Sequence, residues 1–197
     1  MVFKHKSVAY GFYVGVRIGW CVMAKNGLHL ITPTSVSGTG LSITANGSVT
    51  MSGAQYMTIN GVFTGDYDNY MIIIHADPAS LTSWNMRVAS GGTGENGSNY
   101  TVQSIYADST TVGGNRTTTS YWQANYMDTT ANGFIWHLYG PYLAQPTAMR
   151  IVDAGSRNGA YINDHAGTHS LSSSYDGLYV WAGATYSGRL AVYGLRK

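Results

Sequence analysis

Apolar and polar residues alternate in short runs along this chain, and the runs end at turn dipeptides. In residues 41–45 every second residue is apolar, Asn46-Gly47 follows, and Val49 and Met51 resume the alternation. Alternation places one set of side chains on one face of a β-strand, and Asn-Gly readily adopts the positive φ angles of a tight hairpin turn. Residues 41–52 are therefore predicted to form a β-hairpin. Similar turn signals recur at Asn60-Gly61, Asn96-Gly97, Asn132-Gly133, Asn158-Gly159 and Asp176-Gly177.

One run is apolar on both of its faces. In Tyr70–His75, Ile72 and Ile74 fall on one face, and Met71 and Ile73 fall on the other. That pattern is typical of a central strand whose two faces are both covered. Further strands are predicted at 55–59, 84–89, 99–107, 117–126, 133–139, 148–153, 160–163, 177–182 and 186–195.

The spacing of strands and turns predicts an all-β fold, an antiparallel β-sandwich of jelly-roll-like type. No segment shows a helical period with caps. Residues 28–197 are predicted to form a single domain, since the Gly-rich stretch 90–98 is interpreted as a loop between strands. The residues expected in the core are Phe63, Ile72, Ile74, Trp136, Leu138, Ile151, Val180 and Val192.

Residues 1–27 are expected to be an N-terminal arm or extension. Early lysines followed by an apolar run resemble a signal peptide, although Arg17 interrupts the run. Glycines at four-residue spacing resemble a membrane helix, but the apolar stretch is shorter than the ~20 residues that span a bilayer. The alternation from Val8 to Trp20 also fits a strand, and Met23 fits a true start preceded by an extension. The sequence leaves these four interpretations open, and no membrane partner is expected.

Charged residues make up only 10% of the chain, whereas ordinary soluble domains carry roughly 25%. With 16 tyrosines and 5 tryptophans, the chain does not have the composition of a disordered protein. The net charge of +2 comes from residues 1–22, which hold three basic residues and no acidic one. The rest of the chain is nearly neutral and has no basic stripe, so no nucleic acid is expected as a partner. Cys21 is the only cysteine, which excludes an intrachain disulfide.

Two short patterns resemble metal sites but lack ligands. The segment 66–69 begins like a calcium loop, but Tyr70 and Met71 stand where an oxygen ligand and a glycine are needed. His165 and His169 are spaced to face one metal, yet no third ligand lies nearby in the sequence. No metal and no other cofactor is expected.

Catalytic patterns are incomplete as well. The chain has no G-x-S-x-G elbow, which would hold a nucleophilic serine on a strained turn. Glycoside hydrolysis usually needs two carboxylates across a cleft, and Glu95 is the only glutamate. The chain is therefore expected not to be an enzyme.

The aromatic residues offer the main candidate for a binding surface. Tyrosine and tryptophan beside serine, asparagine and glycine form adaptable recognition surfaces, so one hypothesis is a sugar-binding or protein-binding patch. The alternative is that these side chains fill the core of the sandwich and its rim. The candidate interaction surface consists of Trp122, Tyr126, Tyr139, Tyr142 and Trp181.

Three stretches together resemble small structural proteins of tailed-bacteriophage particles. Residues 62–72 contain Phe-Thr-Gly-Asp-Tyr-Asp-Asn-Tyr, which resembles the F-T-x-x-Y-x-x-Y strand entry of that group. Residues 91–100 resemble its Gly/Asn-rich loop that ends in tyrosine, and residues 187–195 resemble its terminal S-G-x-x-x-V-Y-G-L strand. The order and spacing also match, so the resemblance covers about residues 28–197.

The resemblance implies a non-enzymatic virion component of the capsid-decoration or cement, head-fibre or tail-fibre type, as found in phages that include those of cyanobacteria. A homo-oligomer is expected because exposed tyrosine, tryptophan and methionine on a nearly neutral chain would otherwise leave apolar patches. The resemblance implies that this oligomer is a trimer and that it also packs against phage capsid or tail proteins. Tyr67 and Tyr70 are expected to cap a sheet edge with their hydroxyls outward. The alternatives are a tail-fibre module that binds host-surface glycan and, third, a secreted hydrolase. No catalytic residue belongs to the pattern.

Overall fold

The computed structural model describes residues 27–130, 132–156 and 160–196, and within these ranges it contains β-strands and no helix. All the strand pairs are antiparallel, so the predicted all-β, sandwich-type fold is confirmed. The arm interpretations for residues 1–22 and the turn at Asn158-Gly159 lie outside the described residues. The strands are β1 (Leu28–Ile31), β2 (Ser35–Ser37), β3 (Leu41–Ile43), β4 (Val49–Asn60), β5 (Tyr67–Pro78), β6 (Thr82–Ser90), β7 (Thr93–Gly94), β8 (Tyr100–Asp108), β9 (Thr111–Thr119), β10 (Trp122–Met127), β11 (Gly133–Tyr139), β12 (Thr147–Ser156), β13 (Ala160–His169) and β14 (Gly177–Arg196).

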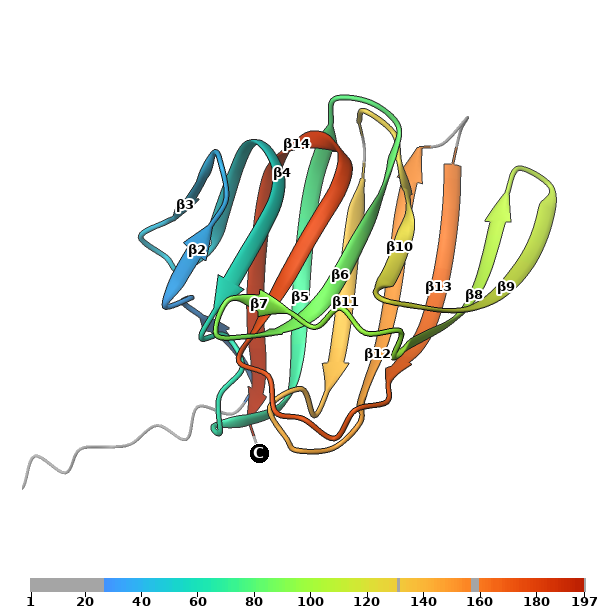
Figure 1. The fold of residues 1–197 in the computed structure, drawn as a ribbon. Helices are drawn as coiled ribbons and strands as arrows, with labels where there is room; N and C mark the ends of the chain where they lie inside the picture. The colour runs from blue at the N-terminus through green and yellow to red at the C-terminus, as the bar shows by residue number, and fades with distance from the viewer. Residues whose placement is uncertain (1–26, 131, 157–159, 197) are drawn as a thin grey trace, which may run out of the picture.

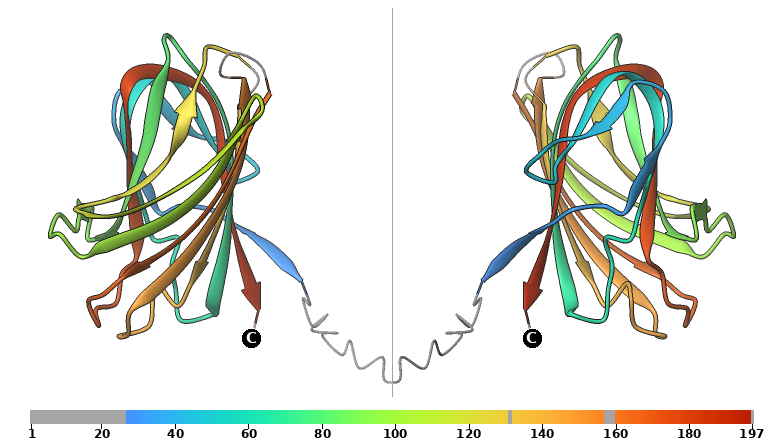
Figure 2. Two further views of the ribbon diagram at one scale, coloured as in Figure 1. Left: turned by 90° about the vertical axis from the view of Figure 1, so that its right-hand side faces the viewer. Right: turned by 90° about the vertical axis from the view of Figure 1, so that its left-hand side faces the viewer.

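The long strand β14 folds the sheet over on itself. Its first part, 177–182, pairs with β4 and β6, whereas its second part, 186–196, pairs with β5 and with β1 or β4. The register of β14 against β4 shifts between Trp181 and Tyr186 and again before Gly188. β14 therefore bends between its two parts, and one antiparallel sheet forms two packed layers (Figures 1 and 2). The two strands expected at 177–182 and 186–195 are one strand.

The two layers differ in width. The front layer, nearer the viewer in Figure 1, contains β2, β4, the first part of β14, β6, β7 and β10. The rear layer runs in the order β14-β5-β11-β12-β13-β8-β9. β10 is the last strand of the front layer, and it contacts β12, β13 and β8. The β8–β9 hairpin therefore extends beyond the front layer, at the right of Figure 1.

The core lies between the layers. All eight residues that alternation placed in the core are buried, with Ile72, Trp136, Leu138, Ile151 and Val180 fully so. Trp84 stacks on Phe134 from the opposite layer with ring centroids 6.0 Å apart, and it contacts Tyr186 with centroids 4.7 Å apart. Large aromatic side chains thus supply the apolar contact area that a chain without a possible disulfide needs.

The hairpin predicted at residues 41–52 is confirmed, because Leu41 pairs with Met51 and Ile43 with Val49. The second strand of this hairpin continues to Asn60 and includes the strand expected at 55–59. The strand expected at 117–126 is wrong. The chain turns at Ser120, so that β9 ends the rear layer while β10 ends the front layer.

Two expectations for β5 are also wrong. β5 is central in its layer, since it pairs with β14 and β11, but only its inner face is covered, and Ile73 on the outer face is exposed. Tyr70 does not point outward. Its side chain is buried, and its hydroxyl donates to the Thr64 carbonyl at 2.8 Å and accepts from the Thr64 N–H at 2.8 Å. Burial raises the pKa of Tyr70. The hydroxyl ties the turn before β5 to that strand.

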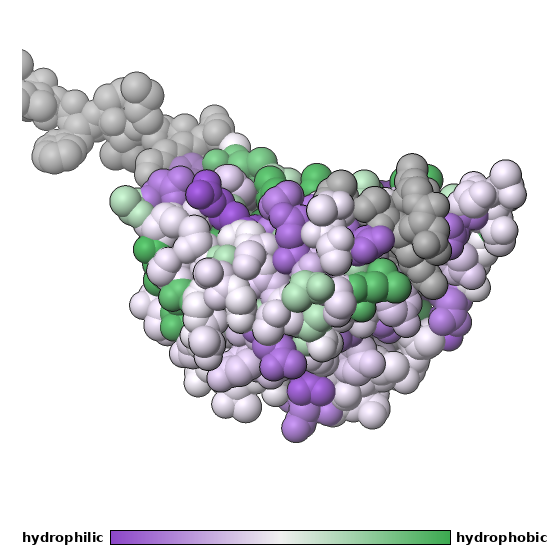
Figure 3. Space-filling view, turned by 90° about the horizontal axis from the view of Figure 1, so that it is seen from above, coloured by the Kyte–Doolittle hydropathy of each residue, from purple (hydrophilic) through white to green (hydrophobic). Residues whose placement is uncertain are grey.

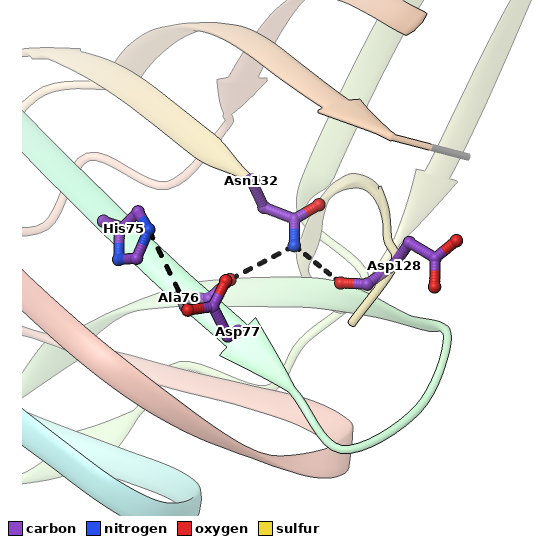
Figure 4. A network of polar contacts seen from close by, with 5 residues as sticks. All are labelled: His75, Ala76, Asp77, Asp128 and Asn132. Carbon is purple, nitrogen blue, oxygen red and sulfur yellow. Dashed lines mark hydrogen bonds and ion pairs between the residues drawn. The ribbon is translucent and has the colours of Figure 1, made fainter. Parts of the chain in front are cut away.

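Asn132 anchors the connection between β10 and β11 (Figure 4). Its buried side-chain amide donates to the Asp128 carbonyl at 2.6 Å and to the Ala76 carbonyl at 3.3 Å. Beside it on β5, His75 Nε2 lies 3.9 Å from the Asp77 carboxylate, and both side chains are exposed. The Asn132-Gly133 turn signal therefore marks a side chain that joins the two layers at the end of β5.

Candidate functional site

The five aromatic residues of the predicted interaction surface do not form one patch. Trp122 is fully buried, and its ring packs edge-on against Tyr100 with centroids 5.0 Å apart. Tyr126 is exposed at the end of β10, whereas Tyr139 and Tyr142 are exposed at the end of β11 and in the following loop. Trp181 is half-buried on the outer face of the front layer. Trp122 is thus a core residue, and the other four lie in three separate places.

Trp181 belongs to an aromatic row that crosses the outer face of the front layer. We define the aromatic row as Tyr56, Tyr179, Trp181 and Tyr121, whose successive ring centroids lie 6.3, 5.3 and 5.2 Å apart. The Arg87 guanidinium stacks 4.8 Å above the Trp181 ring, and its Nε donates to the Ser120 carbonyl at 2.8 Å. These contacts hold flat rings at the surface of a well-paired sheet.

The outer face of the rear layer has a different character. On this face, side chains of paired residues line up in rows that run across β5, β11, β12, β13, β8 and β9. In two neighbouring rows most of the side chains are aliphatic. We define the aliphatic face as the exposed aliphatic residues of these rows: Ile73, Ile135, Val152, Ile162, Ile105 and Val112. Ile105 and Ile162 are each 61% exposed and Val112 is 74% exposed. Together with the backbone between them, these side chains line a shallow hollow of about 850 Å³.

Hydrophobic side chains are visible along the flat upper edge of the molecule in Figure 3, which is the side of the rear layer. One charged pair joins the band to its neighbouring row, because Asp164 lies in the row of Val152 and Ile105 and Arg150 lies in the next row. Arg150 donates to Asp164 through Nε at 2.9 Å and through a terminal nitrogen at 2.5 Å. These hydrogen bonds lower the pKa of the Asp164 carboxyl and raise the pKa of Arg150. The next row, towards the start of β8, contains the polar residues His137, Arg150, Gln103 and Arg116. The aliphatic face is therefore a band with a polar border.

The inner face of the rear layer turns polar where the front layer ends. On β5 and β11 the inward side chains are apolar, as with Ile74 and Phe134. On β13 and β8, beyond the cover of β10, they include Asn163, His165 and Ser104. The space between this inner face and β10 is a groove of about 590 Å³, the polar groove. Residues that line it include Ser104, Tyr106, Gln123, Tyr126, Asn163 and His165.

A serine and a histidine line the floor of the polar groove, and a buried aspartate lies close to the histidine. Ser104 and His165 are cross-strand partners, with Oγ 2.7 Å from Nδ1. His165 Nε2 lies 3.7 Å from the buried Asp153 carboxylate. That carboxylate favours the tautomer with the proton on Nε2, and in this tautomer the Ser104 hydroxyl donates to Nδ1. The sequence patterns do not reveal this group, because its members are distant in the chain and only the strand register brings them together.

His165 and His169, which are spaced like metal ligands, both face inward from β13 but have different neighbours. His169 is fully buried against Tyr100, with ring centroids 4.4 Å apart, and near Tyr175, whose hydroxyl lies 3.5 Å from Nδ1. Burial lowers the pKa of His169 and raises the pKa of both tyrosines. Among the residues described, no three His, Cys, Asp or Glu side chains gather as a metal site. In the same part of the chain, no helix is long and apolar enough to cross a membrane.

Comparison of the chain with protein-family models and with curated proteins finds no match in either case.

Proposed function

We propose that this chain is a non-enzymatic structural protein of a bacteriophage particle, a capsid-decoration or tail-fibre component that assembles with copies of itself. The main support for this proposal is the aliphatic face. Soluble monomers rarely expose large contiguous apolar patches, and an apolar sheet face normally packs against another element. The resemblance of residues 28–197 to phage structural proteins supports the virion as the location, and phage capsid or tail proteins as further partners.

The occupant that we propose for the aliphatic face is a second copy of the same chain. The face carries no net charge, because Arg150 and Asp164 neutralise each other. Copies repel each other little, since the chain beyond residue 22 has 8 basic and 9 acidic residues. Interfaces between identical chains are rich in apolar side chains and poor in lysine and glutamate, as this face is.

A trimer is the proposed state. Identical chains usually close their contacts by rotational symmetry. A narrow apolar band with a polar border can face a threefold axis, where the band of each copy packs against the bands of the other two. The choice of three copies comes from the resemblance, because phage fibres and decoration proteins are often threefold symmetric.

The assembly is tested by light scattering on the full chain with a matched pair of variants. Ile105 and Gln103 lie two residues apart on the same face of β8, one within the aliphatic face and one in its polar border. Ile105→Lys places a charge in the band and should give monomers at micromolar concentration, whereas Gln103→Lys should remain a trimer. A wild-type chain that stays monomeric would contradict self-assembly in solution, and a dimer would contradict the threefold arrangement.

The location is tested separately by mass spectrometry of purified phage particles. The chain should be present at a fixed copy number relative to the major capsid protein or a tail protein. Its absence from particles that are otherwise complete would overturn the virion role, whatever the oligomeric state of the isolated chain.

A second function, recognition of host-surface glycan, is favoured by a different observation. The polar groove presents tyrosine rings beside neutral polar groups, which is the composition of adaptable recognition surfaces.

A further inference from the structure

We infer that the polar groove is a binding site for a neutral oligosaccharide, and that Tyr126 and Gln123 on β10 and Asn163 on β13 contact the ligand. This inference specifies the site of the second proposed function, on which it rests. It does not depend on assembly through the aliphatic face, because the groove lies on the opposite side of the rear layer.

The shape of the groove follows from the unequal widths of the layers. The rear layer continues through β8 and β9 after the front layer has ended at β10. The inner face of this overhang and the edge of β10 enclose about 590 Å³, within the range of roughly 300–1,000 Å³ for small-molecule sites. The groove remains open at the side, so a ligand that is one part of a longer chain can enter it.

The floor of the groove holds polar groups that the protein leaves without hydrogen bonds. Asn163 is 4% exposed and His165 is 5% exposed, and both line the groove. Within the described residues, Asn163 Nδ2 and His165 Nε2 make no hydrogen bond. A buried donor without a partner costs free energy, so such groups are usually satisfied by a ligand or by bound water. A sugar hydroxyl can accept a hydrogen bond from Asn163 Nδ2.

The charge of the groove selects the class of ligand. Among the described residues that line it there is no lysine or arginine, and the only carboxylate is that of Asp108. An anionic ligand such as a phosphate or a sialylated glycan therefore finds no lysine or arginine to pair with. Amide, hydroxyl and carboxylate groups instead match the alternating donors and acceptors of a neutral sugar.

Tyrosine rings supply the apolar part of recognition. Tyr106 and Tyr161 lie side by side in the groove, with centroids 6.3 Å apart and an angle of 14° between their planes. Tyr126 lines the groove from β10 with 44% of its surface exposed. The C–H faces of a sugar ring pack on flat aromatic rings, and tyrosine provides such a ring at low cost in conformational entropy.

The Ser104–His165–Asp153 group fits recognition better than catalysis. Ser104 lies within strand β8 and not on a strained turn, so its hydroxyl is held as a cross-strand partner. His165 Nε2 is 3.7 Å from Asp153, too far for the hydrogen bond that orients a catalytic base. We therefore assign the Ser104 hydroxyl, held in place by His165, to accepting a hydrogen bond from a ligand hydroxyl.

The test uses the full chain and two tyrosines of nearly equal exposure. Tyr126 in the groove is 44% exposed and Tyr56 in the aromatic row is 45% exposed, so replacing either tyrosine by alanine removes a similar area of exposed aromatic surface. The wild type is first screened on an array of neutral, sialylated and sulfated oligosaccharides. Titration calorimetry with the best neutral binder then compares the variants. We expect at least a ten-fold weakening of binding, about 1.4 kcal/mol, for Tyr126→Ala and for Gln123→Ala, and a change of less than about two-fold for Tyr56→Ala.

Each other outcome contradicts the inference. If no neutral oligosaccharide binds, or if only anionic ones do, the assigned ligand class is wrong. If Tyr56→Ala abolishes binding while Tyr126→Ala keeps it, the aromatic row and not the groove is the site, and glycan recognition itself survives. Hydrolysis of p-nitrophenyl acetate by the wild type that is lost in Ser104→Ala would replace binding by catalysis. In all these cases, light scattering still reports separately on assembly.

Discussion

The two halves of the rear layer have opposite polarity. Where the front layer covers β5 and β11, the inward side chains such as Ile72 and Trp136 are apolar and fully buried. Where the layer overhangs, on β13 and β8, the inward side chains include the polar Ser104, Asn163 and His165, and the outward Ile162 and Ile105 are apolar and exposed. Alternation along a strand allows either orientation, because every second side chain points to the same face. The difference shows that the covered half is folded around its own core, whereas the apolar side of the overhang is turned outward, where another molecule can cover it.

The largest expected effect separates the two halves by stability. Ile72→Ala removes a fully buried side chain from the covered half and should lower the free energy of unfolding by about 2–5 kcal/mol, through lost transfer energy and an unfilled cavity. Ile105→Ala in the overhang should change it by less than about 0.5 kcal/mol in the monomer, since the side chain is already in water. Urea unfolding at low protein concentration measures both. Equal losses would mean that the overhang has a core of its own.

A smaller effect distinguishes a buried histidine of the rear layer from an exposed one by pH. Burial lowers the pKa of His169 in the folded protein, so the unfolded chain binds more protons as pH falls below the ordinary histidine pKa of about 6.5. The stability that neutral His169 provides is therefore complete above that pH and declines as pH falls from about 6.5 towards the lowered pKa. His169→Gln should flatten the dependence of the unfolding free energy on pH between about 7 and 5.

The control for this pH effect is His75→Gln, which removes a histidine from the outer face, where its side chain is 63% exposed. Urea unfolding at several pH values gives the slope for each variant. If His169→Gln keeps the wild-type slope, burial of the imidazole does not contribute to the loss of stability in acid.

The sequence predicts the covered half well and the overhang poorly, for a physical reason. Alternation identifies strands such as 133–139, and it places Ile72, Trp136 and Val192 in the core, because the core follows the usual inward apolar pattern. The same pattern cannot say which face of β13 and β8 is inward, since that depends on where the front layer ends. Ser104, His165 and Asp153 come together only through strand register, and their spacing along the chain does not reveal which strands pair or in which register.

The smallest expected effect concerns the Arg150–Asp164 pair at the border of the aliphatic face. Arg150 lowers the pKa of Asp164 by donating two hydrogen bonds, so Arg150→Met should raise that pKa towards its ordinary value. A lowered carboxyl pKa stabilises the fold at neutral pH and ceases to do so as pH falls below about 4. Because both side chains are about half exposed, water screens the pair and the urea midpoint at pH 7 should stay close to that of the wild type.

Carboxylate NMR titration of the Arg150→Met variant follows Asp164 directly, with Asp77 on the same outer face as an internal reference. The variant also replaces a cation by an apolar side chain beside Val152, so the aliphatic face becomes wider and self-association should strengthen. A clear drop in the urea midpoint would contradict this view of the overhang. It would show that the overhang is held in place by its own surface pairs, and that the exposed aliphatic side chains need no partner to stay where they are.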